Sequence, residues 1–213
     1  ISMGYYDSKL GAQELVNEYV SKYNLNVVSL LPGTMFGPYD FLIGTGLYLL
    51  SVYKNNMPVV LKNAGLPLAH VTDVARGHVL AMEKAGSGTQ YILSGNEDDN
   101  RSLKNMVQLI AEVLSQKFPD KKFRKNVFEI PFGIAHVAAF FSELYAKLFN
   151  QPMLLSTDAV WAGRNQLFYT TQKAKNDLGY EPQFTFRQAV SDMVDYYAAN
   201  NLFEREGRWI DKR

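Results

Sequence analysis

The sequence predicts an α/β protein whose parallel sheet is incomplete, with its N-terminal part absent. Residues 27–31 (VVSLL) form a short, nearly continuous apolar run, which is typical of a strand buried on both faces between helices. Such a strand needs a neighbour on each edge, yet the residues before it are all expected to be helical. The later candidates, at 58–61 and 89–94, are too few to build a wide sheet. We therefore expect part of the sheet to be missing upstream.

The composition indicates a globular protein with one large domain, or one domain and an appendage. Of 213 residues, 47% are hydrophobic and 20% are charged, which excludes a disordered chain. The formal net charge of +1 offers no electrostatic case for a nucleic-acid partner. The absence of cysteine excludes disulfides and thiolate chemistry and is compatible with the cytoplasm, the location we expect. Because the chain starts at Ile1 without the pattern of a signal peptide, we expect a fragment, a processed chain or an incomplete sequence.

The first predicted element is a helix over 3–23. Its apolar residues recur at helical spacing in one stripe: Ala12, Leu15, Val16, Tyr19, Val20 and Tyr23. After the strand at 27–31, residues 32–38 (PGTMFGP) are rich in residues that end regular structure. This loop is a candidate ligand site, because α/β proteins bind ligands at the carboxyl ends of parallel strands and glycine lets the backbone approach a flat ring closely. The alternative is a plain strand-to-helix turn.

The next elements are a helix over 42–53 and a strand over 58–61. Residues 68–75 (LAHVTDVA) then pass from a short strand into a helix capped by Thr72 or Asp73. His70 is more typical of a hydrogen-bonded structural histidine than of a catalyst. The three histidines lack the grouping of a metal site.

A strand at 89–94 and a helix from Ser102 to about 117 follow, then a charged, irregular interval at 118–131. Residues 132–149 are an apolar helix interrupted by four polar residues: His136, Ser142, Glu143 and Lys147. This helix is too polar for a confident membrane span, which needs ~20 mostly apolar residues. Core packing or a ligand-pocket wall is the favoured role, and peripheral membrane attachment is the alternative.

The last predicted elements are a short strand and two helices. Residues 167–170 are the candidate strand, and Thr171 caps a helix that ends before Gly179, with Pro182 just beyond. The final amphipathic helix covers 185–200. Its predicted buried residues are Ala189, Val190, Met193, Val194 and Tyr197.

The residue pair with the clearest chemistry is Tyr5 and Lys9, in the motif YYDSK. At i and i+4 on a helix, their side chains lie one turn apart on one face. A nearby ammonium group favours the phenolate and lowers the pKa of a phenol by ~1–3 units from about 10, towards the range of general acid–base catalysis. The alternative is an ordinary tyrosine beside a solvated lysine.

Four motifs in order resemble the C-terminal part of the extended short-chain dehydrogenase/reductase family. The likeness is to the branch with dihydroflavonol reductases, 3β-hydroxysteroid dehydrogenases and nucleotide-sugar epimerases. The motifs are YYDSK at 5–9, LPGTMFGP at 31–38, HVTDVA at 70–75, and Lys173-Ala174 with Leu178-Gly179-Tyr180 and Pro182.

The resemblance implies an incomplete Rossmann-like, doubly wound sheet with a smaller, mostly helical substrate-binding lobe. It implies that Tyr5 is the catalytic acid or base, and that Lys9 lowers its pKa and holds the nicotinamide ribose. Pro32 and Gly33, followed by Thr34 and Met35, would line the nicotinamide of NAD or NADP. Residues 1–94 would be the C-terminal part of the dinucleotide-binding domain. Residues 95–213 would be mainly the substrate lobe, and a return of segments near 155–175 to the core is the alternative.

The resemblance favours an NAD(P)-dependent oxidoreductase acting on a small-molecule carbonyl or hydroxyl substrate. A nucleotide-sugar epimerase or dehydratase is the enzymatic alternative, and a non-catalytic NAD(P)-sensing or scaffold protein is another. A homodimer is an expected assembly, because helix-paired dimers are common in the family. No Gly-x-x-Gly-x-x-Gly phosphate loop is present in the sequence, so we expect this fragment alone to be inactive.

Overall fold

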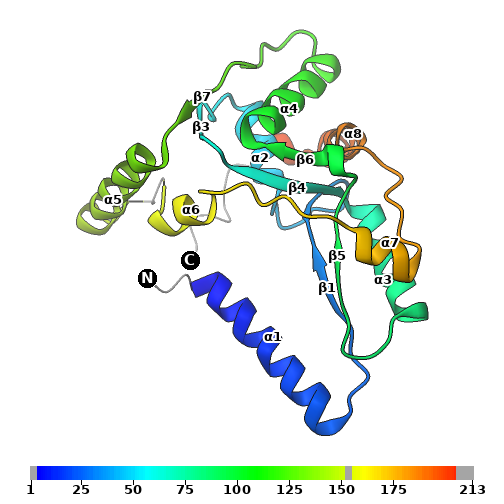
Figure 1. The fold of residues 1–213 in the computed structure, drawn as a ribbon. Helices are drawn as coiled ribbons and strands as arrows, with labels where there is room; N and C mark the ends of the chain where they lie inside the picture. The colour runs from blue at the N-terminus through cyan, green and yellow to red at the C-terminus, as the bar shows by residue number, and fades with distance from the viewer. Residues whose placement is uncertain (1–3, 152–154, 205–213) are drawn as a thin grey trace.

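The computed structural model describes residues 4–151 and 155–204, and for Tyr5 the backbone alone. Helices and short strands alternate along these residues, as Figure 1 shows. The helices are α1 (Gly4–Tyr23), α2 (Gly46–Tyr53), α3 (Val71–Lys84), α4 (Leu103–Lys117), α5 (Phe132–Phe149), α6 (Thr157–Ala162), α7 (Gln172–Leu178) and α8 (Phe186–Ala199). The strands are β1 (Ser29–Pro32), β2 (Thr34–Phe36), β3 (Val59–Leu61), β4 (Gly65–His70), β5 (Gln90–Leu93), β6 (Asn100–Ser102) and β7 (Phe128–Ile130).

The strands pair mainly in parallel, which confirms the predicted α/β class. β1 pairs with β5, β2 with β4, and β3 with β7, all in parallel, while β6 adds to β4 in antiparallel orientation. In the β1–β5 register Ser29 lies opposite Gln90 and Pro32 opposite Leu93. The carboxyl ends of these two strands are therefore level with each other, at the point where β2 begins beside β4.

The prediction that residues 27–31 are a strand buried on both faces is wrong. Regular pairing begins at Ser29, and Leu31 and Pro32 are exposed. Within the described residues β1 has one partner strand, β5, and Figure 1 shows α1 diverging from both strands. The apolar stripe of α1 is likewise largely open, because Leu15 and Tyr19 are exposed. Both apolar surfaces therefore lie uncovered by the described residues.

The main core lies between α2, α4 and α8 on one side of β2 and β4. Its buried side chains include Phe36, Leu68, Ile110 and Tyr197. A second cluster joins α3 and α7 to β5 through Leu93, Leu178 and Tyr180. A small third cluster joins α5 to α6, through Ala135, Ala139 and Val160.

Local sequence signals fix several of the helix ends. The Ser102 hydroxyl accepts a hydrogen bond from the backbone N–H of Asn105 at 3.2 Å, so the predicted cap of α4 is confirmed. Gly179 ends α7 in the left-handed conformation at φ 71°, where glycine carries no Cβ penalty. Thr185 and Gln188 form a reciprocal capping box at the start of α8.

Four other sequence expectations differ from the structure. The loop expected at 32–38 contains strand β2 at residues 34–36, which is held by pairing with β4. The interval 118–131, predicted to be irregular, contains β7, which is held by pairing with a distant strand. Residues 167–170, a predicted strand, form no strand, although the neighbouring Gln166 makes an isolated bridge with Gly65. The cap of α3 is His70 rather than Thr72 or Asp73, because its Nδ1 accepts the backbone N–H of Thr72 at 3.0 Å.

Candidate active site

The first two turns of α1 carry Tyr5 and Lys9, one turn apart on one helical face. The structure places both residues in regular helix, with the side chain of Lys9 exposed. The side chain of Tyr5 lies outside the described parts of the structure. The contact between phenol and amine therefore stays a prediction, and the helical spacing of the two residues is what the structure provides.

The candidate cofactor residues lie where three strands converge. Pro32 ends β1, Thr34 and Met35 begin β2, and Gly33 lies between the two strands. The Gly33 backbone N–H donates to the carbonyl oxygen of Leu93 at 2.8 Å, which joins this loop to the end of β5. α1 and β1 run in opposite directions, so the first turn of the helix and the carboxyl end of the strand point towards the same end of the molecule (Figure 1).

Gly33 has a structural reason to be glycine that is independent of any cofactor. A Cβ at this position would lie 2.7 Å from the Ser94 hydroxyl oxygen and 2.8 Å from the Pro67 carbonyl oxygen. Those separations are shorter than carbon–oxygen contacts allow, so a larger residue would push β4 and β5 apart. The packing requirement therefore adds to the reason expected from the sequence, which was close approach to a flat ring.

A recess of about 550 Å³ adjoins the first turn of α1. It is lined by Tyr6 together with the end of α6 and the segment that follows: Trp161, Ala162, Arg164, Asn165, Leu167 and Tyr169. The lining is mainly apolar and aromatic. It holds one cation, Arg164, whose guanidinium carbon lies 4.4 Å from the centroid of the Trp161 ring. The recess can hold a small organic molecule beside the helix that carries Tyr5.

The far wall of the recess is tied to the central strands by backbone hydrogen bonds. The Leu167 N–H donates to the carbonyl oxygen of Gly65, at the start of β4, at 3.0 Å. The Asn100 amide donates to the carbonyl oxygen of Tyr169 at 3.0 Å. These lining residues were not predicted from the sequence. The signal that could have indicated them is the set of large apolar side chains in an otherwise polar, loop-like stretch, WAGRNQLFY at 161–169.

A second phenol near the first turn of α1 is a poor acid–base group. Burial, and to a smaller extent the charge of Tyr6, raise the pKa of Tyr48 above its usual value. A phenol with a raised pKa has less phenolate near neutral pH and is therefore a poorer general base. The raised pKa therefore disfavours Tyr48 as the acid or base.

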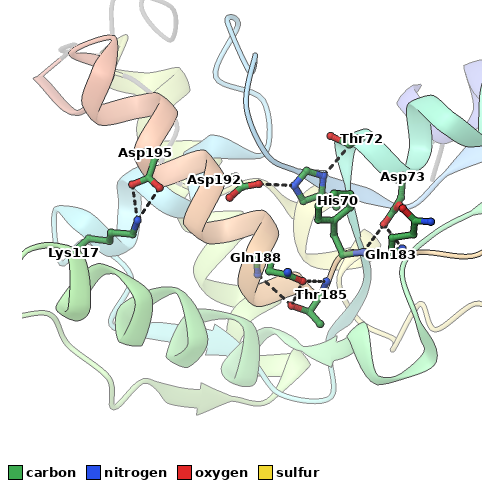
Figure 2. Close-up of polar contacts among 10 residues, drawn as sticks. His70, Thr72, Asp73, Lys117, Gln183, Thr185, Gln188, Asp192 and Asp195 are labelled. Atoms are coloured by element: carbon green, nitrogen blue, oxygen red, sulfur yellow. Dashed lines mark hydrogen bonds and ion pairs between the residues drawn. The ribbon is translucent and has the colours of Figure 1, made fainter.

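Side chains of the HVTDVA motif connect α3 to the C-terminal part of the chain by hydrogen bonds (Figure 2). Asp73 is fully buried, and its Oδ2 accepts the backbone N–H groups of Gln183 and Phe184, each at 3.0 Å. The His70 ring stacks on Phe184 with centroids 4.4 Å apart, and its Nε2 lies 3.1 Å from Asp192 Oδ2 on α8. The prediction of a hydrogen-bonded, structural His70 is confirmed.

A larger, polar recess of about 610 Å³ lies elsewhere, between β6, α4 and the start of α8. Four of its five charged lining side chains pair with one another, since Arg187 contacts Glu112 at 2.6 Å and Arg101 contacts Asp99 at 3.8 Å. It shares no lining residue with α1 or with the loop at 32–38. Within residues 4–151 and 155–204, no group of three or more histidine, aspartate or glutamate residues could hold a metal ion.

The helices and the mainly parallel strand pairs define an α/β protein. A sequence model of the NAD dependent epimerase/dehydratase family matches residues 2–94. That segment contains the Tyr5 and Lys9 motif, the loop at 32–38 and the HVTDVA motif at 70–75. The resemblance predicted from these motifs is thereby confirmed.

Curated relatives extend the likeness over most of the chain. A putative dihydroflavonol 4-reductase of Synechocystis is 29% identical over 177 residues, covering 81% of this chain and 48% of the relative. A 3 beta-hydroxysteroid dehydrogenase/Delta 5-->4-isomerase of Mycobacterium tuberculosis is 24% identical over 208 residues, covering 94% of this chain and 53% of the relative. The chain thus spans about half the length of the curated relatives it matches.

Solved structures share the fold. The crystal structure of gox2253 superposes with a TM-score of 0.73 at 27% identity, covering 94% of this chain and 59% of that one. The dTDP-glucose 4,6-dehydratase of Bacillus anthracis in complex with NAD superposes with a TM-score of 0.65 at 19% identity, covering 93% of this chain and 53% of that one. The Rossmann-like fold class is therefore confirmed.

Proposed function

We propose that this chain is the acid–base and substrate-binding part of an NAD(P)-dependent oxidoreductase that reduces a carbonyl compound or oxidises the matching alcohol. The observation that carries the proposal is the spacing of Tyr5 and Lys9, at i and i+4 in the first two turns of α1, in a helix whose Tyr6 lines an apolar recess. The match of residues 2–94 to an NAD dependent family supports it.

Tyr5 is the proposed proton donor and acceptor. In carbonyl reduction its phenol gives a proton to the substrate oxygen as the carbonyl carbon gains a hydride, and the phenolate then regains a proton from solvent. In alcohol oxidation the phenolate removes the hydroxyl proton. The Lys9 ammonium, one turn away, stabilises the phenolate and so lowers the pKa of Tyr5 by ~1–3 units.

The residues at 32–35 fit the nicotinamide end of the cofactor. The exposed Pro32 and Met35 give this strand edge an open apolar surface at the carboxyl end of β1, which suits one face of a flat ring. Lys9 would meet the adjoining ribose. The cofactor, NAD or NADP, supplies or accepts the hydride. The chain contains no glycine-rich phosphate loop, so the proposal gives it the nicotinamide end alone.

The recess beside α1 favours a substrate with an apolar or aromatic body. Trp161, Leu167 and Tyr169 supply apolar surface, and Arg164 supplies one hydrogen-bond donor group for a polar substituent. A nucleotide-sugar substrate is the second candidate. Its support is a 24% identical dTDP-glucose 4,6-dehydratase of Xanthomonas campestris, covering 93% of this chain. The proposed location of the protein is the cytoplasm, where NAD(P) is available.

The test is cofactor oxidation by the full-length protein. NADH and NADPH oxidation are followed spectroscopically across a panel of aliphatic, aromatic and steroidal carbonyl compounds and nucleotide sugars, for wild type and Tyr5→Phe. Loss of the phenol removes general acid catalysis and is expected to lower kcat by ~10²–10⁴-fold. The matched control is Tyr19→Phe, which removes an exposed phenol from the same helix and is expected to keep the wild-type rate.

Each remaining outcome contradicts part of the proposal. Wild-type rates in Tyr5→Phe would remove the acid–base assignment. Turnover restricted to nucleotide sugars, without net cofactor oxidation, would make the protein an epimerase or dehydratase. Tight cofactor binding with no turnover in either form would make it a binding or scaffold protein.

A further inference from the structure

The helix α5 directs two polar side chains inwards and most of its large apolar side chains outwards. Its inner face carries Ala135 and Ala139, which are buried, the half-buried Phe132, and the two polar side chains. The Ser142 hydroxyl accepts the backbone N–H of Leu155 at 3.1 Å. The Glu143 carboxylate accepts the backbone N–H of Thr157 at 2.6 Å and its hydroxyl at 2.8 Å. Polar contacts therefore fix which face of α5 meets the body of the protein.

The outer face of α5 presents large apolar side chains to the surroundings. Eight of them are between 41% and 68% exposed: Ile134, Val137, Phe140, Phe141, Leu144, Tyr145, Leu148 and Phe149. Lys147 is the one charged residue among the exposed residues of α5. Proteins that stay free in water rarely expose a contiguous apolar patch of this extent, so the face is expected to have a binding partner.

α5 is long and apolar enough by composition to cross a membrane, yet 11% of its residues are buried, unlike a core helix. A length of 18 residues corresponds to ~27 Å, slightly less than the ~30 Å hydrocarbon core. Crossing would also draw the attached α6 and its polar contacts into the hydrocarbon. A helix held by one side to a folded body can instead lie in the plane of the membrane interface, with its other face in the lipid.

A fixed cluster of cations precedes α5 in the chain. Residues 121–125 (KKFRK) contain four cations, of which Lys122, Arg124 and Lys125 are exposed. The Asn55 side chain holds this segment, because its amide donates to the Lys122 carbonyl oxygen at 3.0 Å and accepts the Arg124 N–H at 2.7 Å. Within the described part of the chain, none of the three exposed cations forms an ion pair with a carboxylate.

The cationic segment and α5 are joined by another exposed apolar residue. Phe128, on β7 between them, is 73% exposed, and its register partner Val59 on β3 is 44% exposed. An exposed apolar residue therefore lies between the cations and α5 in the chain. A protein whose formal net charge is +1 gathers three unpaired cations on this one short segment.

We propose that α5 and the segment 121–125 form a binding surface for an anionic lipid bilayer. The outer face of α5 enters the boundary between headgroups and acyl chains, and Lys122, Arg124 and Lys125 contact lipid phosphates or carboxylates. Charge complementarity favours this occupant over a second copy of the chain. A twofold contact would place the same patch against itself, and there the three exposed cations outnumber the exposed carboxylates Asp120 and Glu129.

The experiment measures binding of the full-length protein to vesicles by co-sedimentation. One set of vesicles is phosphatidylcholine alone, and the other contains an equal part of phosphatidylserine. Binding is expected for the anionic vesicles, and it should fall as salt is raised. Lys122→Gln with Arg124→Gln and Lys125→Gln is expected to weaken binding roughly a hundred-fold, since each cation contributes about five-fold near an anionic surface. Phe141→Ser with Leu148→Ser is expected to weaken it at least as much as the triple charge variant, because the apolar burial is lost.

A matched control tests whether loss of any exposed apolar side chain weakens vesicle binding. Met82 on α3 is 80% exposed, and Met82→Ser is expected to leave vesicle binding unchanged. Thermal unfolding shows that each variant is folded. The proposal is overturned if the full-length protein binds neither kind of vesicle, or binds both equally. It is also overturned if sedimentation without lipid shows a dimer that the Phe141→Ser and Leu148→Ser variant dissociates.

Discussion

α8 and α5 are both amphipathic helices, but they present opposite faces to the protein. α8 buries its apolar side chains, among them Val190 and Met193, against α4 and β4. α5 contacts the body through Phe132 at its start and through alanine, serine and glutamate, and it exposes its other aromatic residues. The comparison shows that an apolar stripe defines a face of a helix without saying what that face meets. Polar contacts on the other face decide which side is attached.

The largest expected contrast comes from truncating one large side chain on each helix. Met193 is 1% exposed, and Met193→Ala is expected to lower the free energy of unfolding by ~2–5 kcal/mol, because the cavity cannot fill. Leu148 is 68% exposed, and Leu148→Ala should change it by no more than ~0.5 kcal/mol. Urea unfolding measures both. Equal losses would mean that α5 is packed against something in the free protein.

A second contrast lies among the carboxylates of the α8 region (Figure 2). Asp73→Ala leaves the buried N–H groups of Gln183 and Phe184 without an acceptor, and a loss of ~2–3 kcal/mol is expected. Asp195 pairs with Lys117 at 2.7 Å, but its side chain is 59% exposed, so Asp195→Ala should cost less than ~1 kcal/mol. If both variants unfold at the same urea concentration, Asp73 does not hold the C-terminal segment.

The smallest expected effect is the weakening of the α5–α6 contact as the pH is lowered. Hydrogen bonds from the backbone and side chain of Thr157 lower the pKa of Glu143. A lowered pKa stabilises the folded state above the unfolded pKa, and this stabilisation is lost as the pH falls through the folded pKa. Glu143→Gln should reduce hydrogen-exchange protection of α6 at neutral pH and remove its decline on acidification. Wild-type protection in the variant would show that α5 is attached by other contacts.

The sequence predicted those parts of the fold in which local and long-range preferences agree. The buried positions of α8, the Ser102 cap and the Gly179 stop follow from periodicity and end chemistry, and the structure has all three. His70 was not expected as the cap of α3, because histidine is an uncommon cap and its position depends on Phe184 and Asp192 far along the chain. β7 was missed because three residues carry too little periodicity without their partner β3.

The candidate site divides in the same way. The Tyr5 and Lys9 spacing and the loop at 32–35 are local patterns, so the sequence alone supplies them. The lining residues of the recess were not predicted, because their place beside α1 depends on long-range contacts. The segment after α6 is held by hydrogen bonds to β4 and to Asn100, which are distant in the sequence. The exposure of the apolar face of α5 was not predicted for a related reason. The face that contacts the protein is set by the hydrogen bond of Glu143 with Thr157, which lies outside the helix.

The pH dependence of alcohol oxidation tests the central claim, that Lys9 makes the Tyr5 phenol reactive, most directly. In this direction the phenolate acts as base, so kcat/KM rises with pH through the pKa of Tyr5. In the full-length protein, Lys9→Met should move this rise upward by ~1–3 pH units. Lys22→Met, a matched change at the other end of α1, should leave it in place. A profile that does not move in Lys9→Met would contradict the proposed pairing.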